Sequence, residues 1–195
     1  PNQQLATLKN LLNECVPKIL LLEKPLATNN RDLKELKNIC NEYQNMTVLV
    51  NYIRSFLPAI DKVQKIIQTG KLGKFVYGNL VYGKGLLNNA SHFINLAELL
   101  IGPFNLKKKG RAIAKCFDYD EEINIVLNLK KDSNASLNVV SISRFGLVAG
   151  ELDLWFSKGR VLWPNNEKNI FIWTSEEEKT NNSKYYELEN NPKRI

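Results

Sequence analysis

The sequence has few of the residues that form metal centres and disulfide frameworks. Its 195 residues include one histidine and three widely spaced cysteines, Cys15, Cys40 and Cys116. An odd number of distant cysteines excludes a disulfide scaffold and favours a reduced, cytoplasmic protein. Because no cysteine has a histidine or a second cysteine at ligand spacing, we expect no metal site.

Long apolar runs are also missing. The longest stretches, ILLL at 19–22 and FINLAELLIG at 93–102, are short or interrupted by polar residues. No signal-peptide pattern opens the chain. We therefore expect no membrane partner.

The charge is positive but not concentrated. The net charge is +7 and the sequence pI is about 9.2, yet the densest cluster is only Lys107–Lys109 beside Arg111. Acidic residues interrupt elsewhere, at 118–122 and 176–178. No zinc-finger spacing and no RNP-like aromatic motif is present, so we predict no nucleic-acid partner. A phosphate-bearing small molecule would account for the positive excess equally well.

The first quarter of the chain has parallel α/β character. Leucines at helical spacing predict a helix over 3–15, and an apolar run predicts a short strand over 18–23 that is buried on both faces. The polar residues at 28–32 can cap a second helix, and TVLVNY at 47–52 reads as a second strand. This order is that of the last part of a doubly wound sheet.

The remainder has α+β character. We expect a helix over 58–68, a strand over 74–82, a glycine-rich turn and a helix over 91–100. Alternating stretches then predict strands of a mostly antiparallel sheet at 111–118, 123–129, 135–143, 147–156, 160–163 and 169–174. The sequence thus predicts α/β followed by α+β, with a remnant of a dinucleotide-binding domain at 1–53 and a second domain at 54–195. Five apolar residues would supply part of two buried faces of the sheet: Leu137, Val139, Leu152, Leu154 and Phe156.

No glycine-rich phosphate loop is present. The glycines between 70 and 85 lack both the GxGxxG spacing and the strand–turn–helix setting that such a loop requires. A doubly wound domain that begins at its fourth or fifth strand is incomplete, so we expect further sequence before Pro1. We also expect these 195 residues alone to bind nicotinamide nucleotides weakly or not at all.

Glu23-Lys24-Pro25 stands at the carboxyl end of the first strand. Ligands of open α/β sheets bind outside those ends. A partly desolvated lysine at this place could polarise a hydroxyl or carbonyl oxygen. The alternative is a solvated lysine beside a proline that starts a turn.

The only histidine opens the helix that follows the glycine-rich turn. His92 lies close in sequence to the short polar residues Asn88, Asn89 and Ser91. An imidazole in such a place suits proton transfer in an alcohol–carbonyl interconversion. The alternative is a histidine that caps the helix start.

A third polar group, Asn51, Tyr52 and Arg54, follows the second strand. The Arg54 guanidinium could hold an anionic or amide group of a ligand. An ion pair at the domain boundary would explain it as well.

The segments EKPLA, VNYIRSFLP and NNASHFINLAELLIG, in this order, resemble the glucose–fructose oxidoreductase and inositol dehydrogenase (Gfo/Idh/MocA) family over about residues 1–163. That family pairs an NAD(P)-binding Rossmann domain with a domain built on a large antiparallel sheet. The resemblance implies an NAD(P)-dependent oxidoreductase that acts on a sugar or nucleotide sugar, in a role such as surface polysaccharide biosynthesis. It also implies a homo-oligomer formed through the antiparallel sheet.

The resemblance assigns roles to the polar residues already noted. Lys24 and His92 match the family's catalytic lysine and acid–base histidine, and Pro25 matches a proline that is usually cis. Glu23, Lys24, Pro25 and Arg54 would contact NAD or NADP. The substrate would meet Lys24, Asn51, Tyr52, Asn88, Asn89 and His92.

The sequence departs from the family at several positions. Asn88 and Asn95 stand where aspartates are expected around the histidine, and Ile53 stands where an arginine is expected. An amide cannot support an imidazolium by its charge. The family's closing helix is not evident after residue 175. These departures favour an alternative function, a non-catalytic or truncated family member that serves as an oligomerisation or ligand-binding module.

Overall fold

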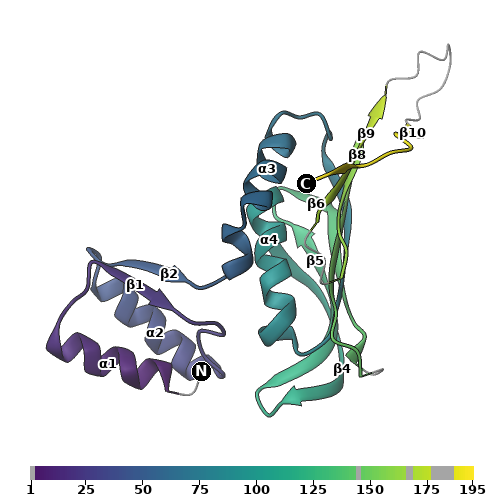
Figure 1. The fold of residues 1–195 in the computed structure, drawn as a ribbon. Helices are drawn as coiled ribbons and strands as arrows, with labels where there is room; N and C mark the ends of the chain where they lie inside the picture. Colours follow the sequence, from purple (N-terminus) through teal and green to yellow (C-terminus); the bar gives the residue numbers. More distant parts are fainter. Residues whose placement is uncertain (1–2, 144–145, 166–168, 177–186) are drawn as a thin grey trace.

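The computed structural model describes residues 3–143, 146–165, 169–176 and 187–195. The chain begins with a small parallel layer (Figure 1), and its elements are α1 (Gln4–Glu14), β1 (Ile19–Leu22), α2 (Asn30–Glu42) and β2 (Thr47–Val50). β1 and β2 pair in parallel. Asn29 caps α2, because its side chain accepts the Asp32 N–H at 2.9 Å, as the polar run at 28–32 predicts.

One face of the β1–β2 pair is buried and the other is open. Leu20 and Leu22 pack under α1 and α2, while Ile19 and Leu21 of the same strand are 65% and 59% exposed. Figure 1 shows both helices on the same side of the two strands. The predicted parallel α/β character is therefore present, but the expectation that β1 is buried on both faces is wrong, because α1 and α2 both pack on one side of the strand pair (Figure 1).

A large sheet follows. The elements after β2 are η1 (Ile53–Phe56), α3 (Pro58–Gln68), β3 (Phe75–Tyr82), η2 (Leu86–Ala90), α4 (Ser91–Ile101), β4 (Phe104–Phe117), β5 (Asp120–Leu129), β6 (Asp132–Ser141), β7 (Gly150–Phe156), β8 (Gly159–Trp163), β9 (Phe171–Glu176), β10 (Glu187–Leu188) and β11 (Lys193–Arg194). The strand order is β10-β9-β8-β7-β3-β6-β5-β4, with β11 against β9. Of the pairs that the described strands form in this sheet, β3–β6 is parallel and the others are antiparallel. This agrees with the predicted mostly antiparallel sheet.

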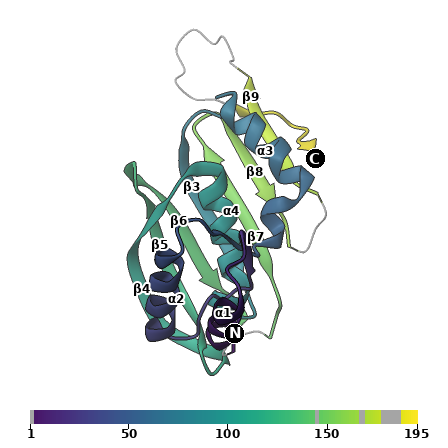
Figure 2. The same ribbon diagram turned by 90° about the vertical axis from the view of Figure 1, so that its left-hand side faces the viewer.

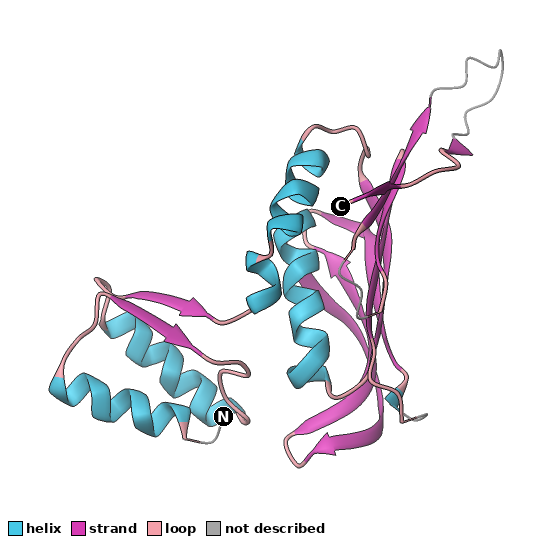
Figure 3. Ribbon diagram, viewed as in Figure 1, coloured by secondary structure: helices cyan, strands magenta, loops and turns pink. Residues whose placement is uncertain are grey.

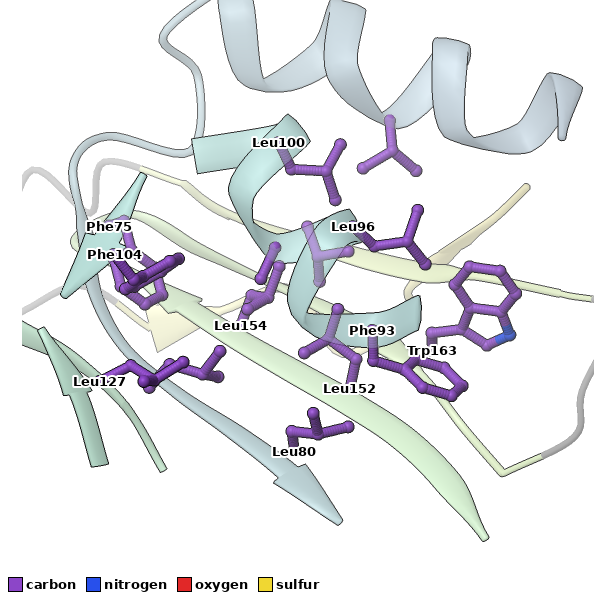
Figure 4. Close-up of a cluster of buried hydrophobic side chains, with 14 of the residues drawn as sticks. Phe75, Leu80, Phe93, Leu96, Leu100, Phe104, Leu127, Leu152, Leu154 and Trp163 are labelled. Carbon is purple, nitrogen blue, oxygen red and sulfur yellow. The ribbon is translucent and has the colours of Figure 1, made fainter. Parts of the chain in front are cut away.

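α3 and α4 cover one face of the large sheet, as Figure 3 shows, and Figure 2 views the sheet through these helices. Figure 4 shows the core between α4 and the strands, where Phe93 and Leu96 meet Leu152 and Leu154. The five apolar residues expected to supply two faces all belong to this one cluster. That expectation is wrong because β6 and β7 flank β3 in a single sheet and turn the same face to the helices.

Tyr82 joins two strands that are not neighbours. Its hydroxyl donates to the Ile123 carbonyl at 2.8 Å and accepts the Ile123 N–H at 2.9 Å. β6, which lies between β3 and β5, ends at Ser141 beside Tyr82. Burial raises the pKa of the Tyr82 hydroxyl to about 12. The end of β3 is thus fixed to the beginning of β5.

The edge strand β4 begins earlier than expected. The sequence predicts a strand from 111, whereas the structure starts it at Phe104, because Lys107–Lys109 hide the alternation. Charged side chains are common on edge strands, where they oppose pairing with other chains. Register shifts within β4–β5 also disturb the pattern.

The end of the chain contains two short strands, β10 and β11, that the sequence does not predict. Residues 177–186, where a closing helix is not evident from sequence, lie outside the described residues. Within the described ranges, no helix combines the length and apolar character needed to span a bilayer.

Candidate active site

The carboxyl ends of β1 and β2 bring two of the three polar groups together. The strands are parallel and in register, so both end at the same edge of the sheet. Asn51 donates from its side-chain amide to Glu23 Oε1 at 2.6 Å, and its backbone N–H donates to the Leu22 carbonyl at 2.8 Å. The Lys24–Pro25 peptide bond is cis, as the resemblance implies.

Lys24 then links this edge to the turn before α4. Its ammonium donates to the backbone carbonyl of Asn88 and lies 3.2 Å from Asn88 Oδ1. Burial, followed by the charge of Arg54, lowers the pKa of the Lys24 amine, whereas Asp120 and Glu23 act in the opposite direction. An ammonium has three donors, so one remains for a ligand oxygen after both Asn88 contacts are made.

The turn that carries Asn88 has an unusual backbone. Lys84 has φ 69° and Gly85 has φ 94°, and the π-helical turn η2 then leads directly into α4. A non-glycine residue with positive φ is uncommon and is often found at functional sites. The sequence predicts a glycine-rich turn here but not its π-helical form.

His92 is buried on the first turn of α4. Its side chain is 7% exposed, and its ring makes an edge-to-face contact with Tyr52 at a centroid distance of 5.6 Å. Among the described residues, no group hydrogen-bonds to His92 Nδ1. Burial, then the charges of Lys24 and Arg54, lower the pKa of the imidazole to about 4. His92 is therefore neutral near pH 7, and its buried Nδ1 is a polar atom without a hydrogen-bond partner among the described residues.

Arg54 of η1 contacts α4 through Phe93. Its guanidinium lies 4.8 Å from the centre of the Phe93 ring, and burial lowers its pKa. The neighbouring Ser55 donates to Asn95 Oδ1 at 2.6 Å. Asn95, one of the residues at which the sequence departs from the resemblance, thus connects η1 to α4.

Asn89 is held by the backbone. Its side-chain nitrogen donates to the Gly83 carbonyl at 2.8 Å and to the Ala149 carbonyl at 2.5 Å, and the residue is buried. These bonds attach the turn to the segment before β7. Substrate contact by Asn89 stays a prediction, as it does for Asn51, Tyr52 and Asn88.

The sequence did not single out two buried acids at the beginning of β5. Asp120 and Glu122 are 0% and 1% exposed and accept backbone N–H groups of the turn between β3 and α4. In the sequence they belong to an acidic run that looks solvated. The available signal was their spacing, because residues two apart share one face of a strand while Glu121 points away.

The single histidine makes the charge state of the site measurable. We expect the His92 ring signals to titrate with a midpoint near 4 in a proton NMR titration. The unfolded chain has a histidine pKa of about 6.5, so it binds the proton first as the pH falls. The His92 contribution to stability is therefore complete above about pH 6.5 and decreases from there towards pH 4. Lys24→Met should raise the midpoint, since it removes a nearby positive charge; a midpoint near 6.5 in the parent chain would contradict this assignment.

No family model matches the sequence, and no curated protein matches it. Solved structures do match its fold. An NAD-binding oxidoreductase from Klebsiella pneumoniae has a TM-score of 0.69 at 12% identity and covers 88% of this chain and 53% of its own. The fold is shared with NAD-binding oxidoreductases.

Two further solved structures share the fold of this chain. An oxidoreductase from Agrobacterium radiobacter in complex with NAD+, L-tartaric acid and magnesium has a TM-score of 0.68 at 14% identity, covering 98% of this chain and 59% of its own. Levoglucosan dehydrogenase in complex with NADH and levoglucosan has a TM-score of 0.63 at 15% identity. The match covers 90% of this chain and 53% of the dehydrogenase chain. The chain spans little more than half the length of these structures. At these identities the likeness shows the fold alone.

Proposed function

We propose that this chain carries the substrate-side half of an NAD(P)-dependent oxidoreductase that interconverts a hydroxyl and a carbonyl group. The observation that carries the proposal is His92, a buried neutral imidazole with an unpartnered Nδ1 in a site that also contains Lys24 and Arg54. An orphaned polar atom in a buried position calls for a partner, and a substrate hydroxyl would supply one. The shared fold of NAD-binding oxidoreductases supports the same class of reaction.

The residues have separable roles. His92 would accept the hydroxyl proton during oxidation and return it during reduction. Lys24 would place its remaining N–H on the same oxygen and stabilise the negative charge that develops there. Asn88 orients Lys24 through its carbonyl, and Tyr52 holds the imidazole ring by edge-to-face contact.

The cofactor end of the site fits a nicotinamide nucleotide. Glu23, Lys24 and Pro25 at the strand end, with Arg54 opposite, would hold it; two cations and one anion suit a ligand with phosphate, ribose and amide groups. When bound, the nicotinamide supplies a hydride acceptor or donor. The division of the chain between residues 53 and 54 belongs to this proposal: the first part would belong to the cofactor domain and the second would carry the substrate side and the oligomer interface.

A sugar-type substrate is the finer part of the proposal. Among the structures that share the fold, levoglucosan dehydrogenase is in complex with levoglucosan in one case and with L-sorbose in another. Polyol substrates suit a site with several short polar groups, and Asn51, Asn88 and Asn89 would supply them. By the resemblance, the substrate would more narrowly be a nucleotide sugar, and the reaction would belong to surface polysaccharide synthesis.

The open face of the large sheet would make a homo-oligomer. A row of side chains crosses four strands there: Tyr77, Trp155, Arg160 and Trp173 occupy paired positions on β3, β7, β8 and β9. The Arg160 guanidinium lies 4.5 Å from the Trp155 ring and 5.0 Å from the Trp173 ring. Exposed aromatic and arginine side chains are typical of protein interfaces.

A non-catalytic ligand-binding module is the second candidate. Both asparagines that replace aspartates have local partners, because Asn88 donates to the Lys84 carbonyl at 2.9 Å and Asn95 accepts from Ser55. These amides can position groups but cannot carry a proton. Sugar binding without turnover would favour this second function.

The test is an activity screen on a form of the protein that includes a dinucleotide-binding half. We expect reduced-nicotinamide absorbance to appear with NAD+ or NADP+ and at least one sugar or sugar nucleotide. Lys24→Met should lower the rate at least ~100-fold, because the developing oxygen charge loses its donor. Equal rates in Lys24→Met and the parent protein would reject this role, and calorimetry on the 195 residues alone should show weak or no NAD(P) binding.

A further inference from the structure

Two carboxylates from β5 hold the turn between β3 and α4. Asp120 accepts the Leu87 N–H at Oδ1 and the Asn88 N–H at Oδ2, both at 2.8 Å. Glu122 Oε1 accepts the Gly85 N–H at 2.6 Å. Burying a carboxylate is costly unless its oxygens are hydrogen-bonded. Here the backbone of one turn supplies much of that bonding.

Gly85 allows this close approach. A Cβ at this position would lie 2.1 Å from Asp120 Oδ2, and the residue has φ 94°, which glycine adopts without strain. The short motif Gly83-Lys84-Gly85 therefore has a structural purpose besides forming a turn. It lets a buried carboxylate sit against consecutive backbone N–H groups.

The two acids differ in what they reach. Glu122 is satisfied locally, since Ser141 Oγ donates to it at 2.7 Å and Ser143 Oγ donates to its other oxygen. Asp120 instead connects to Lys24 in two ways. The residue whose N–H it accepts, Asn88, presents its carbonyl to the Lys24 ammonium, and the Asp120 charge opposes the lowering of the Lys24 pKa.

We propose that Asp120 is a positioning residue of the candidate active site. It fixes the turn whose Asn88 carbonyl receives Lys24, and its negative charge offsets the repulsion of the Lys24 ammonium by Arg54 and Lys84. Glu122 anchors the start of the same turn without acting on the charge of Lys24. The inference rests on the proposed function only in the importance it gives to Lys24.

The test is the titration of Lys24 in the 195-residue chain, followed by NMR of isotopically labelled lysine and assigned by the signal lost in Lys24→Met. The charges that face Lys24 are Arg54 from η1, Asp120 from β5, Glu23 just after β1 and Lys84 from the turn. Asp120→Asn should lower the Lys24 midpoint by roughly half a pH unit or more, because it removes one attractive charge.

Glu122→Gln is the matched control. It removes an equally buried carboxylate that bonds to the same turn, so it should cost comparable stability, but it should leave the Lys24 midpoint within about 0.2 pH units. Equal shifts in the two variants would show general loosening of the turn and overturn the proposal. No shift in Asp120→Asn would overturn it as well.

A second measurement covers the case in which Asp120→Asn does not fold. Coupling between two sites is reciprocal, so Lys24→Met should raise the Asp120 carboxyl midpoint by the amount that Asp120→Asn would lower that of Lys24. An unchanged carboxyl midpoint would overturn the proposal. These readouts do not depend on turnover, so a failed activity screen would reject the proposed function without affecting this inference.

Discussion

Replacement of His92 by alanine is expected to lower kcat by about 10²–10⁴-fold, the usual contribution of a positioned acid or base. In the proposed function, the substitution removes the group that exchanges a proton with the substrate hydroxyl. His92 is not among the residues assigned to the cofactor, so cofactor affinity should stay within about threefold of the parent value, about 0.6 kcal/mol. The measurement is steady-state kinetics with cofactor titration, on a form that carries a dinucleotide-binding half.

Two variants separate proton transfer from packing. His92→Gln fills a similar volume and keeps hydrogen-bonding groups, yet it cannot carry a proton, so it should be as slow as His92→Ala. Leu99→Ala, on the exposed side of the same helix, should retain parent activity. Near-parent kcat in His92→Gln would show that the imidazole only fills space.

Leu154→Ala is expected to destabilise the large-sheet part by about 2–5 kcal/mol. Leu154 is fully buried in the centre of β7, between β3 and β8 and beneath α4 (Figure 4). The deletion removes apolar contacts and leaves a cavity among close-packed neighbours. With a urea slope of about 2 kcal/mol per molar, the middle of the usual range, the unfolding midpoint should fall by roughly 1–2.5 M. Tryptophan fluorescence reports this transition, since all three tryptophans lie on β7, β8 and β9.

Leu147→Ala makes the same chemical change on the surface. Its side chain is 57% exposed, so the change in stability should stay within about 0.5 kcal/mol. Similar midpoints for Leu147→Ala and Leu154→Ala would contradict the placement of Leu154 in the core.

The sequence predicted best those elements whose signals are local. The helix over 58–68 agrees residue for residue, because Pro58 suits the first turn and the apolar residues follow a 3.6-residue period. The start of the strand β4 was predicted seven residues too late, since its lysines lie on an edge and do not alternate. Alternation also could not show that the buried faces of β6 and β7 coincide, which depends on strand order.

The candidate site was predicted only in part, because only some of its residues have local sequence signals. Lys24 and His92 were found from strand-end and helix-start positions, and from the resemblance. Asp120 and Glu122 were not, because a buried acid looks like a solvated one until its partners are known. Those partners include backbone N–H groups more than 30 residues away, which no side-chain pattern records.

The two hydrogen bonds between Tyr82 and Ile123 have a consequence for the motion of the turn before α4. It ties the end of β3, where the turn begins, to the start of β5, from which Asp120 and Glu122 project. The turn is thus anchored both along the chain and across the sheet, so it cannot open without disturbing β5. In amide hydrogen exchange, the end of β3, the turn and the start of β5 should behave as one cooperative unit. Lys24, which approaches from β1, would then be the part of the site free to move against a fixed surface.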